Sequence, residues 1–164
     1  MNAERPREAV APAAEEAKRT TRHSARWKGG ETLALYGAVG LGSMIGGVLR
    51  ALVSSAGVWG PALPLGTLFI NVLGSFLIGF YATLTGPGGR IFAGPRQRQF
   101  VMVGFCGGFT TFSMFTLETL MLVEDGRPAA AGLYVVVSIV SWLAAVWLGH
   151  VLALRLNRLR GSER

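Results

Sequence analysis

The stretch GFCGGFTTFSMF, residues 104–115, lies within a long apolar part of the chain and decides how that part folds. It places three glycines and two threonines among twelve residues. Glycine is among the poorest helix formers, and threonine loses side-chain freedom in a helix. The sequence therefore predicts a break near Gly107–Thr111 in a segment that is otherwise expected to form one continuous helix.

The composition around this stretch is typical of a membrane protein. Of 164 residues, 51% are hydrophobic and 15% are charged, whereas soluble domains carry roughly 25% charged residues. The single cysteine, Cys106, excludes an internal disulfide and a metal site built from several cysteines. Lys and Arg number 16 against 9 acidic residues. In a membrane protein this surplus marks cytoplasmic segments, so we expect no nucleic-acid partner.

Four apolar stretches are long enough to cross a lipid bilayer, which takes about 20 residues. They run from Leu33 to Ser54, from Leu63 to Leu84, from Phe100 to Val123 and from Ala129 to Leu154. We therefore expect an all-α membrane protein with a four-helix transmembrane domain at residues 31–156. The expected location is the cell inner membrane or plasma membrane.

The two ends of the chain differ from the apolar stretches. Residues 1–30 are charged and lack the apolar core of a secretory signal, which predicts a mobile cytoplasmic tail, with an amphipathic surface helix as the alternative. Residues 157–164 predict a basic C-terminal tail. Four spans place both tails on the same side as the loop 86–99, and that side carries fourteen Lys and Arg residues against two on the other. This bias places both termini in the cytoplasm.

Small residues recur at helical spacing in the first span as Gly42-x-x-x-Gly46. This spacing lets two helices approach closely in lipid, and packing within one subunit is its ordinary explanation. Four short helices nevertheless provide little wall for a pore, so we also expect an oligomer.

Polar side chains inside the spans are candidates for function, because each needs a partner in lipid. Asn71 lies in the middle of the second span, where an interhelical hydrogen bond is the ordinary explanation. Arg50 lies near a helix end and can extend to the membrane surface, whereas Glu118 is expected to face a wet cavity. Ser138 is a weaker signal, because a helical serine can bond its own backbone.

A helix break inside a membrane is a candidate ion site. Its carbonyl and amide groups must be satisfied by protein or by a cavity, and unwound segments of transporters bind ions through such groups. Phe112 and Phe115 follow the break at i, i+3 and share a helix face, beside Ser113 and Thr116. Packing or lipid contact usually explains two phenylalanines at this spacing. Their position directly after the break makes a role in an ion pathway the alternative.

Three motifs resemble the Fluc-type fluoride channels, also called CrcB: GSMIGGVLR at 42–50, GTLFINVLGSFLIG at 66–79, and the opening stretch. The resemblance covers all four spans and excludes the N-terminal tail. It implies a fluoride-selective channel, not an enzyme, that exports fluoride passively and lowers its cytoplasmic concentration. It also implies an antiparallel dimer with two pores and a structural Na⁺ at the dimer centre.

The resemblance also implies roles for single residues. Phe112 and Phe115 would line the pore together with Asn71. The backbone carbonyls of Gly107 and Thr110 would hold the Na⁺. The further pathway residues that it implies are Arg50, Ser113, Thr116, Glu118, Tyr134 and Ser138.

Two residues depart from the family pattern, so the resemblance does not decide which polar groups line the pathway at these positions. Met114 stands where a threonine is usual, and Trp142 stands where a small polar residue is expected. At Gly107 we expect a backbone angle that only glycine adopts at little cost, so that a bulky replacement would disturb assembly.

Two other functions and two kinds of dimer remain open at this point. Glu118 supports a proton-coupled carrier for fluoride or small anions, and a structural membrane scaffold would have an unbroken third span. No nucleotide-binding motif suggests a pump. The charge bias conflicts with one chain inserted both ways, so the partner is either a second copy or an oppositely oriented homologous subunit.

Overall fold

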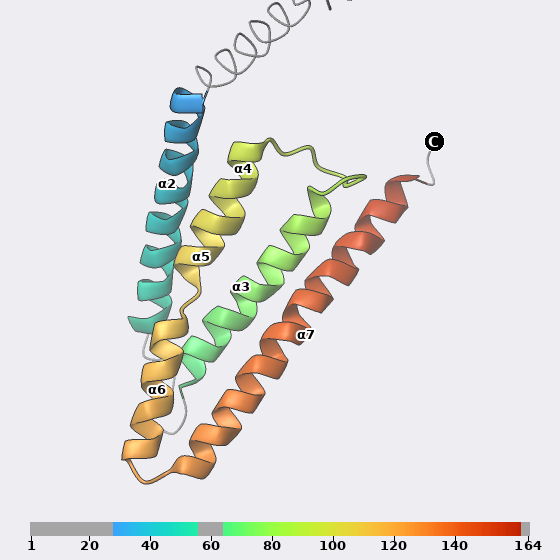
Figure 1. The fold of residues 1–164 in the computed structure, drawn as a ribbon. Helices are drawn as coiled ribbons and strands as arrows, with labels where there is room; N and C mark the ends of the chain where they lie inside the picture. The colour runs from blue at the N-terminus through green and yellow to red at the C-terminus, as the bar shows by residue number, and fades with distance from the viewer. Residues whose placement is uncertain (1–27, 56–63, 162–164) are drawn as a thin grey trace, which may run out of the picture. The chain divides into compact units, whose positions relative to one another are not determined.

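The computed structural model describes residues 28–55 and 64–161, and the chain divides into the units Met1–Tyr36 and Gly37–Arg164. The described residues of the first unit form the start of helix α2 (Lys28–Ser55). The second unit contains the rest of α2 and all later elements, and the residues described in it form helices and no strands. These later elements are α3 (Leu65–Leu84), α4 (Pro95–Gln99), η2 (Phe100–Phe105), α5 (Cys106–Phe109), α6 (Phe112–Glu124) and α7 (Pro128–Gly161) (Figure 1).

Four helical segments are long and apolar enough to cross a membrane, which confirms the prediction of an all-α protein with four candidate spans. They are Gly29–Ser55, Leu65–Leu84, Pro95–Glu124 and Pro128–Arg158. The first, third and fourth segments extend beyond the predicted apolar stretches, because helical backbone continues into less apolar residues at their ends. Of the predicted tails, residues 1–27 and 162–164 lie outside the described residues, whereas residues 28–30 and 157–161 belong to helices α2 and α7. The predicted domain boundaries stay predictions.

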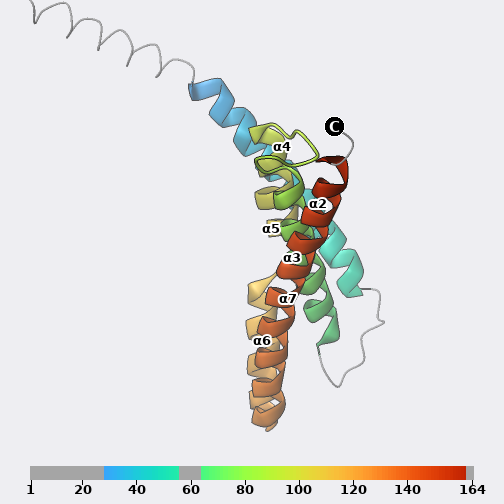
Figure 2. The same ribbon diagram turned by 90° about the vertical axis from the view of Figure 1, so that its right-hand side faces the viewer.

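Helices α3 and α7 lie side by side over much of their length (Figures 1 and 2). Two glycines permit this contact. A Cβ atom at Gly79 would collide with the carbonyl oxygen of Val146, and one at Gly149 would collide with the carbonyl oxygen of Phe76. The first half of α7 packs against α6, as both views show.

The third span contains four helical segments, of which three are α-helices and one is a π-helix. After α4, residues Phe100–Phe105 form a π-helix, and the short α5 follows. Thr110 has extended backbone angles, φ −77° and ψ 158°, and so does Thr111, with φ −147° and ψ 122°. Helix α6 then starts at Phe112, and the Thr111 side chain accepts a hydrogen bond from the Met114 amide at 3.2 Å, as an N-cap does.

The Gly42–Gly46 repeat packs within the subunit, as predicted. A Cβ at Gly42 would lie 3.0 Å from the Cα of Gly104, and one at Gly46 would lie 2.7 Å from the Phe109 amide nitrogen. Ser43, between them, donates a hydrogen bond to the Gly104 carbonyl at 3.3 Å. This part of α2 therefore contacts the main chain of η2 and α5 directly.

Candidate functional site

Asn71 forms a two-way hydrogen-bonded pair with the main chain of Thr111. Its amide Nδ2 donates to the Thr111 carbonyl at 2.9 Å, and its Oδ1 accepts the Thr111 amide at 2.8 Å. The side chain is 5% exposed. The predicted interhelical bond is confirmed, and its partner is main chain rather than another side chain. Because the amide group has two donors, one N–H remains for another partner.

The same pair changes the hydrogen bonding of α5. In a continuous helix the amide of Thr111 would donate to the carbonyl of Gly107, four residues earlier. Here it donates to Asn71 instead. The Thr110 amide and hydroxyl both donate to the Cys106 carbonyl, at 3.0 and 2.9 Å. The Gly107 carbonyl is therefore released from the helical pattern.

The expectation of an unusual backbone angle at Gly107 is wrong. Gly107 lies within α5, and among the described residues only Gly88 and Gly126 have positive φ angles. A Cβ at Gly107 would meet nothing within 4 Å in the described chain. Gly107 has regular helix geometry, so neither its backbone angle nor a close contact within the described chain requires a glycine at this position.

Phe112 and Phe115, which the sequence treats as a pair, lie in different surroundings. Phe112 is 68% exposed, whereas Phe115 is 5% exposed. The Phe115 ring meets Trp142 edge to face, with centroids 4.9 Å apart, and lies 5.3 Å from the Tyr134 ring. The two phenylalanine rings are 5.5 Å apart. Packing therefore accounts for Phe115 and leaves Phe112 without an explanation inside the subunit.

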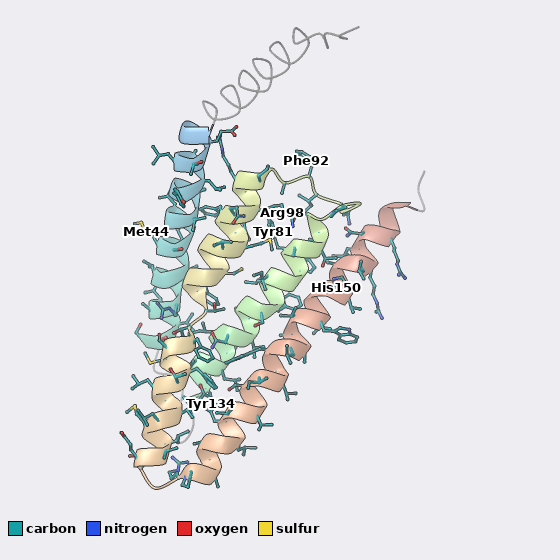
Figure 3. The ribbon with its side chains drawn as sticks, in the orientation of Figure 1. Met44, Tyr81, Phe92, Arg98, Tyr134 and His150 are labelled. Atoms are coloured by element: carbon teal, nitrogen blue, oxygen red, sulfur yellow. The ribbon has the colours of Figure 1, made fainter. Side chains whose placement is uncertain are left out.

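Glu118 accepts hydrogen bonds from two hydroxyl groups on two other helices. The Thr67 hydroxyl donates at 2.7 Å and the Tyr134 hydroxyl at 2.8 Å. Tyr134, labelled in Figure 3, comes from α7. Thr67 was not among the site residues predicted from the sequence. Its position one helical turn before Asn71 is the signal that points to it, because residues at i and i+4 share a helix face.

Ser138 and Trp142 lie one turn apart on α7, and each has a buried polar atom without a partner. The Ser138 side chain is fully buried, and neither its Oγ nor the Trp142 indole nitrogen has a hydrogen-bond partner among the described residues. The Nε of Arg50 is buried and unpartnered in the same sense. Among the described residues, no hydrogen bond joins Arg50 to the other candidate residues.

The hydroxyls at the start of α6 bond locally. The Ser113 hydroxyl lies 3.2 Å from that of Thr111, and Thr116 directs its hydroxyl to the carbonyls of Phe112 and Ser113, at 3.2 and 2.9 Å. Both residues are exposed. Met114, which stands where the family has a threonine, is 42% exposed, so its thioether does not occupy a buried polar position.

A pocket of about 200 Å³ lies at the non-helical threonines. It is lined by Asn71, Ser75, Thr110, Thr111, Phe112 and Trp142. None of these side chains is charged. Ser75 is a second residue that the sequence analysis did not select as a site residue. With Thr67 and Asn71 it forms a polar row at i, i+4 and i+8 on α3.

A family model described as CrcB-like protein, Camphor Resistance (CrcB), matches residues 37–150. The chain belongs to the CrcB family. The fluoride-specific ion channel FluC 1 of Bradyrhizobium diazoefficiens is 55% identical over 137 residues, 84% of this chain and 94% of that protein. FluC 1 of Rhodopseudomonas palustris is 56% identical over 131 residues, with 79% and 93% covered. FluC of Opitutus terrae is 52% identical over 132 residues, with 79% and 100% covered.

The CrcB match contains every residue of the candidate site, from Arg50 to Trp142. It excludes residues 1–36. With four helices that can span a membrane and with these relatives, the CrcB chain is a multi-pass membrane protein. The hydrocarbon core of a membrane offers no hydrogen bonds, so each unpartnered polar group described above needs a partner within protein or within a water-filled cavity.

Proposed function

We propose that this CrcB protein is a fluoride-selective channel that conducts fluoride passively and so lowers its cytoplasmic concentration. The relatives named as fluoride-specific ion channels share 52–56% of their residues with it over most of both chains. The observation that carries the proposal is the uncharged polar pocket at Thr110–Thr111, which joins Asn71 to the exposed ring of Phe112.

The pocket's chemistry suits a small, strongly hydrated anion. A fixed cation would hold fluoride and slow its release, whereas conduction requires binding weak enough to leave. The free N–H of Asn71 and the Ser75 hydroxyl are neutral donors that can replace part of the hydration shell. The edge of a phenylalanine ring is weakly positive and can meet an anion without trapping it.

We infer that the extended threonines form a break inside the third membrane span and that Asn71 holds it open. Lipid offers no hydrogen bonds, so an interrupted helix persists there only if protein satisfies the freed groups. The two bonds between Asn71 and Thr111 provide this satisfaction for one residue. The carbonyl of Gly107, released by the same bonds, is left for an ion or a partner.

The remaining pathway residues are assigned by position. Phe112 and Phe115 would border the ion's path on α6, and the Glu118 group with its two hydroxyl partners would continue it along α6 and α7. The other proposed members of the pathway are Arg50, Ser113, Thr116 and Ser138.

The proposed assembly is an antiparallel dimer with a structural Na⁺ at its centre, held by the carbonyls of Gly107 and Thr110. Main-chain oxygens suit a hard cation of low charge. The exposed, uncrowded surface at Gly107 supports a close approach by a second chain there. Because the ligands would be main-chain atoms, Thr110→Ser should keep Na⁺-dependent dimer stability.

The identity of the second chain can be tested by topology. A cysteine at Asp125, with Cys106→Ala, can be labelled from either side of intact cells; Asp125 is chosen because Gly126 has φ 71°, which disfavours a side chain. Labelling from both sides indicates a homodimer of oppositely inserted copies. Labelling from one side indicates a distinct, oppositely oriented partner. One-sided labelling together with full flux from the purified single chain would contradict the antiparallel dimer.

Fluoride efflux from liposomes that contain only this protein tests the function itself. We expect rapid efflux of fluoride and little of chloride, independent of a proton gradient. Efflux that requires a proton gradient would instead support the proton-coupled carrier, for which the bonded carboxylate Glu118 is the favouring observation. No efflux from the chain or from its heteromer would exclude both.

A further inference from the structure

The indole N–H of Trp142 is a buried hydrogen-bond donor that no described residue satisfies. An indole nitrogen can only donate. A helical serine such as Ser138 can rotate and bond the carbonyl of its own helix, but an indole is too long and too rigid to do so. In a membrane there is also no bulk water to accept the bond. The Trp142 donor therefore calls for an acceptor that is not part of the described subunit.

The position of the indole narrows the choice of acceptor. Trp142 lines the pocket that contains Asn71, Ser75 and Phe112. Its ring is fixed on one side by the edge-to-face contact with Phe115, at an interplanar angle of 72°. Ser138 lies one turn earlier on the same helix face but does not line the pocket, and its hydroxyl can bond its own helix. The Trp142 N–H is thus a buried, unpartnered donor on a residue that lines an uncharged pocket, which matches the needs of an anion.

We propose that the Trp142 N–H donates a hydrogen bond to fluoride in the conduction pathway and that it contributes to selection of fluoride over chloride. This inference rests on the proposed channel function. Hydrogen bonds to an ion are stronger than those between neutral groups, yet a neutral indole adds no fixed charge that would trap the ion. Fluoride is smaller than chloride, so its charge lies closer to the donor hydrogen and the bond is stronger.

The proposal also explains the departure at this position. Where a small polar residue is expected, the indole N–H replaces a hydroxyl as the donor, so the pathway keeps a polar group. The nitrogen is buried, and we place its bond to the ion at the step in which fluoride passes Phe112, the exposed ring of the same pocket.

The decisive variant is Trp142→Phe, which removes the N–H and keeps an aromatic ring. Trp147→Phe is the matched control, because Trp147 lies on the same helix, is 66% exposed and does not line the pocket. We expect Trp142→Phe to lower the fluoride current of single channels about tenfold, the effect of one lost hydrogen bond to an ion, and to reduce the preference over chloride. Trp147→Phe should stay within about twofold of wild type. Trp142→His, which restores an N–H, should recover part of the current.

A single-channel current is required because a lower number of folded channels leaves the current of each one unchanged. Recovery of current by Trp142→His then separates the lost N–H from altered packing against Phe115, which a restored donor would not repair. An unchanged current and selectivity in Trp142→Phe would therefore overturn the proposal, whatever happens to the yield. A current reduced equally in Trp147→Phe would overturn it as well.

A binding experiment separates this inference from the proposed function. With Trp27, Trp59 and Trp147 replaced by Phe, the emission of Trp142 reports on its own N–H. We expect fluoride to shift or quench that emission and equimolar chloride to leave it unchanged. If wild type and its heteromer fail to conduct, the channel proposal fails, and this titration still decides whether Trp142 binds fluoride. Equal responses to both anions, or to neither, would overturn the inference.

Discussion

The third span has a packed side and an open side, and the same residue types occur on both. Gly108 is pressed against α2, where a Cβ would lie 2.7 Å from the Ser43 Cα, whereas a Cβ at Gly107 would meet nothing within 4 Å. Phe115 is buried among aromatic rings, and Phe112 is exposed. One side is thus packed within the subunit, and the other side is uncovered in the described chain.

This difference separates residues that a sequence motif presents as equals. A substitution on the packed side should act first on folding, and one on the open side should act on assembly or conduction while the subunit stays folded. Equal effects on folding at a packed position and at the neighbouring open position of the motif would contradict this distinction between the two sides.

The largest effect is expected for Gly108→Ala against Gly107→Ala. Overpacking in a well-packed region costs about 3 kcal/mol, and at Gly108 the obstacle is main chain, which cannot rotate away. We expect loss of most of the folded protein for Gly108→Ala. For Gly107→Ala the fold should change in stability by no more than about 1 kcal/mol, since alanine favours a helix. Thermal unfolding in detergent measures both.

Light scattering of the Gly107→Ala protein extends this test to the proposed dimer. A folded protein with a weakened, less Na⁺-dependent dimer would place Gly107 at the contact between chains. Equal unfolding temperatures for the two variants would remove the distinction between the two sides.

The next effect concerns Asn71, which joins the two sides through Thr111. Asn71→Ala leaves two buried main-chain groups unpaired, which should destabilise the protein by about 2 kcal/mol and abolish fluoride efflux. Asn71→Asp keeps the acceptor for the Thr111 amide and should fold better than Asn71→Ala. It should still conduct poorly, because it adds a negative charge and removes the N–H donors. Conduction by Asn71→Asp equal to wild type would take Asn71 out of the pathway.

The sequence was sufficient to predict the four helices and the polar residues within them. Apolar length and glycine content are properties of a local segment, and they require no knowledge of neighbours. The partner of Asn71 is different: Thr111 is 40 positions away, and its main chain rather than its side chain makes the bonds. Helical spacing names the residues that share a face but not the segment that the face meets.

The third effect compares Phe115→Ile with Phe112→Ile. Phe115→Ile loses two aromatic contacts that Phe112→Ile keeps, those with Tyr134 and Trp142, each worth about 1 kcal/mol. It should therefore be destabilised by about 2 kcal/mol more than Phe112→Ile. Phe112→Ile should be as stable as wild type, because its ring is mostly exposed. Both should reduce fluoride efflux, since isoleucine lacks the positive ring edge. Normal efflux from folded Phe112→Ile would return that residue to lipid contact.

The same limit explains why Thr67 and Ser75 were not selected as site residues. Single hydroxyl residues in an apolar helix are common and are usually satisfied by their own helix. Their significance depends on Glu118 and on the pocket, both of which come from segments distant in the sequence. Gly107 shows the converse error: a glycine beside the predicted break suggested an unusual backbone angle, but the structure has ordinary helix there.

The smallest effect on stability is expected when the two hydroxyls that bond Glu118 are removed one at a time. Thr67→Val and Tyr134→Phe each remove one donor and keep the shape of the side chain. A hydrogen bond to a carboxylate contributes about 1.5 kcal/mol, so each single variant should lose about that much stability and the subunit should stay folded. Because both donors serve one carboxylate, the losses should not add: the double variant leaves Glu118 with neither bond and should cost more than the sum. A thermodynamic cycle of unfolding in detergent measures this coupling. Additive losses would mean that the two bonds act independently, whereas no loss in any of the three variants would mean that Glu118 is solvated well enough to need neither hydroxyl. That second result would place Glu118 in a wet cavity, as its carboxylate alone suggests, rather than in the packed group.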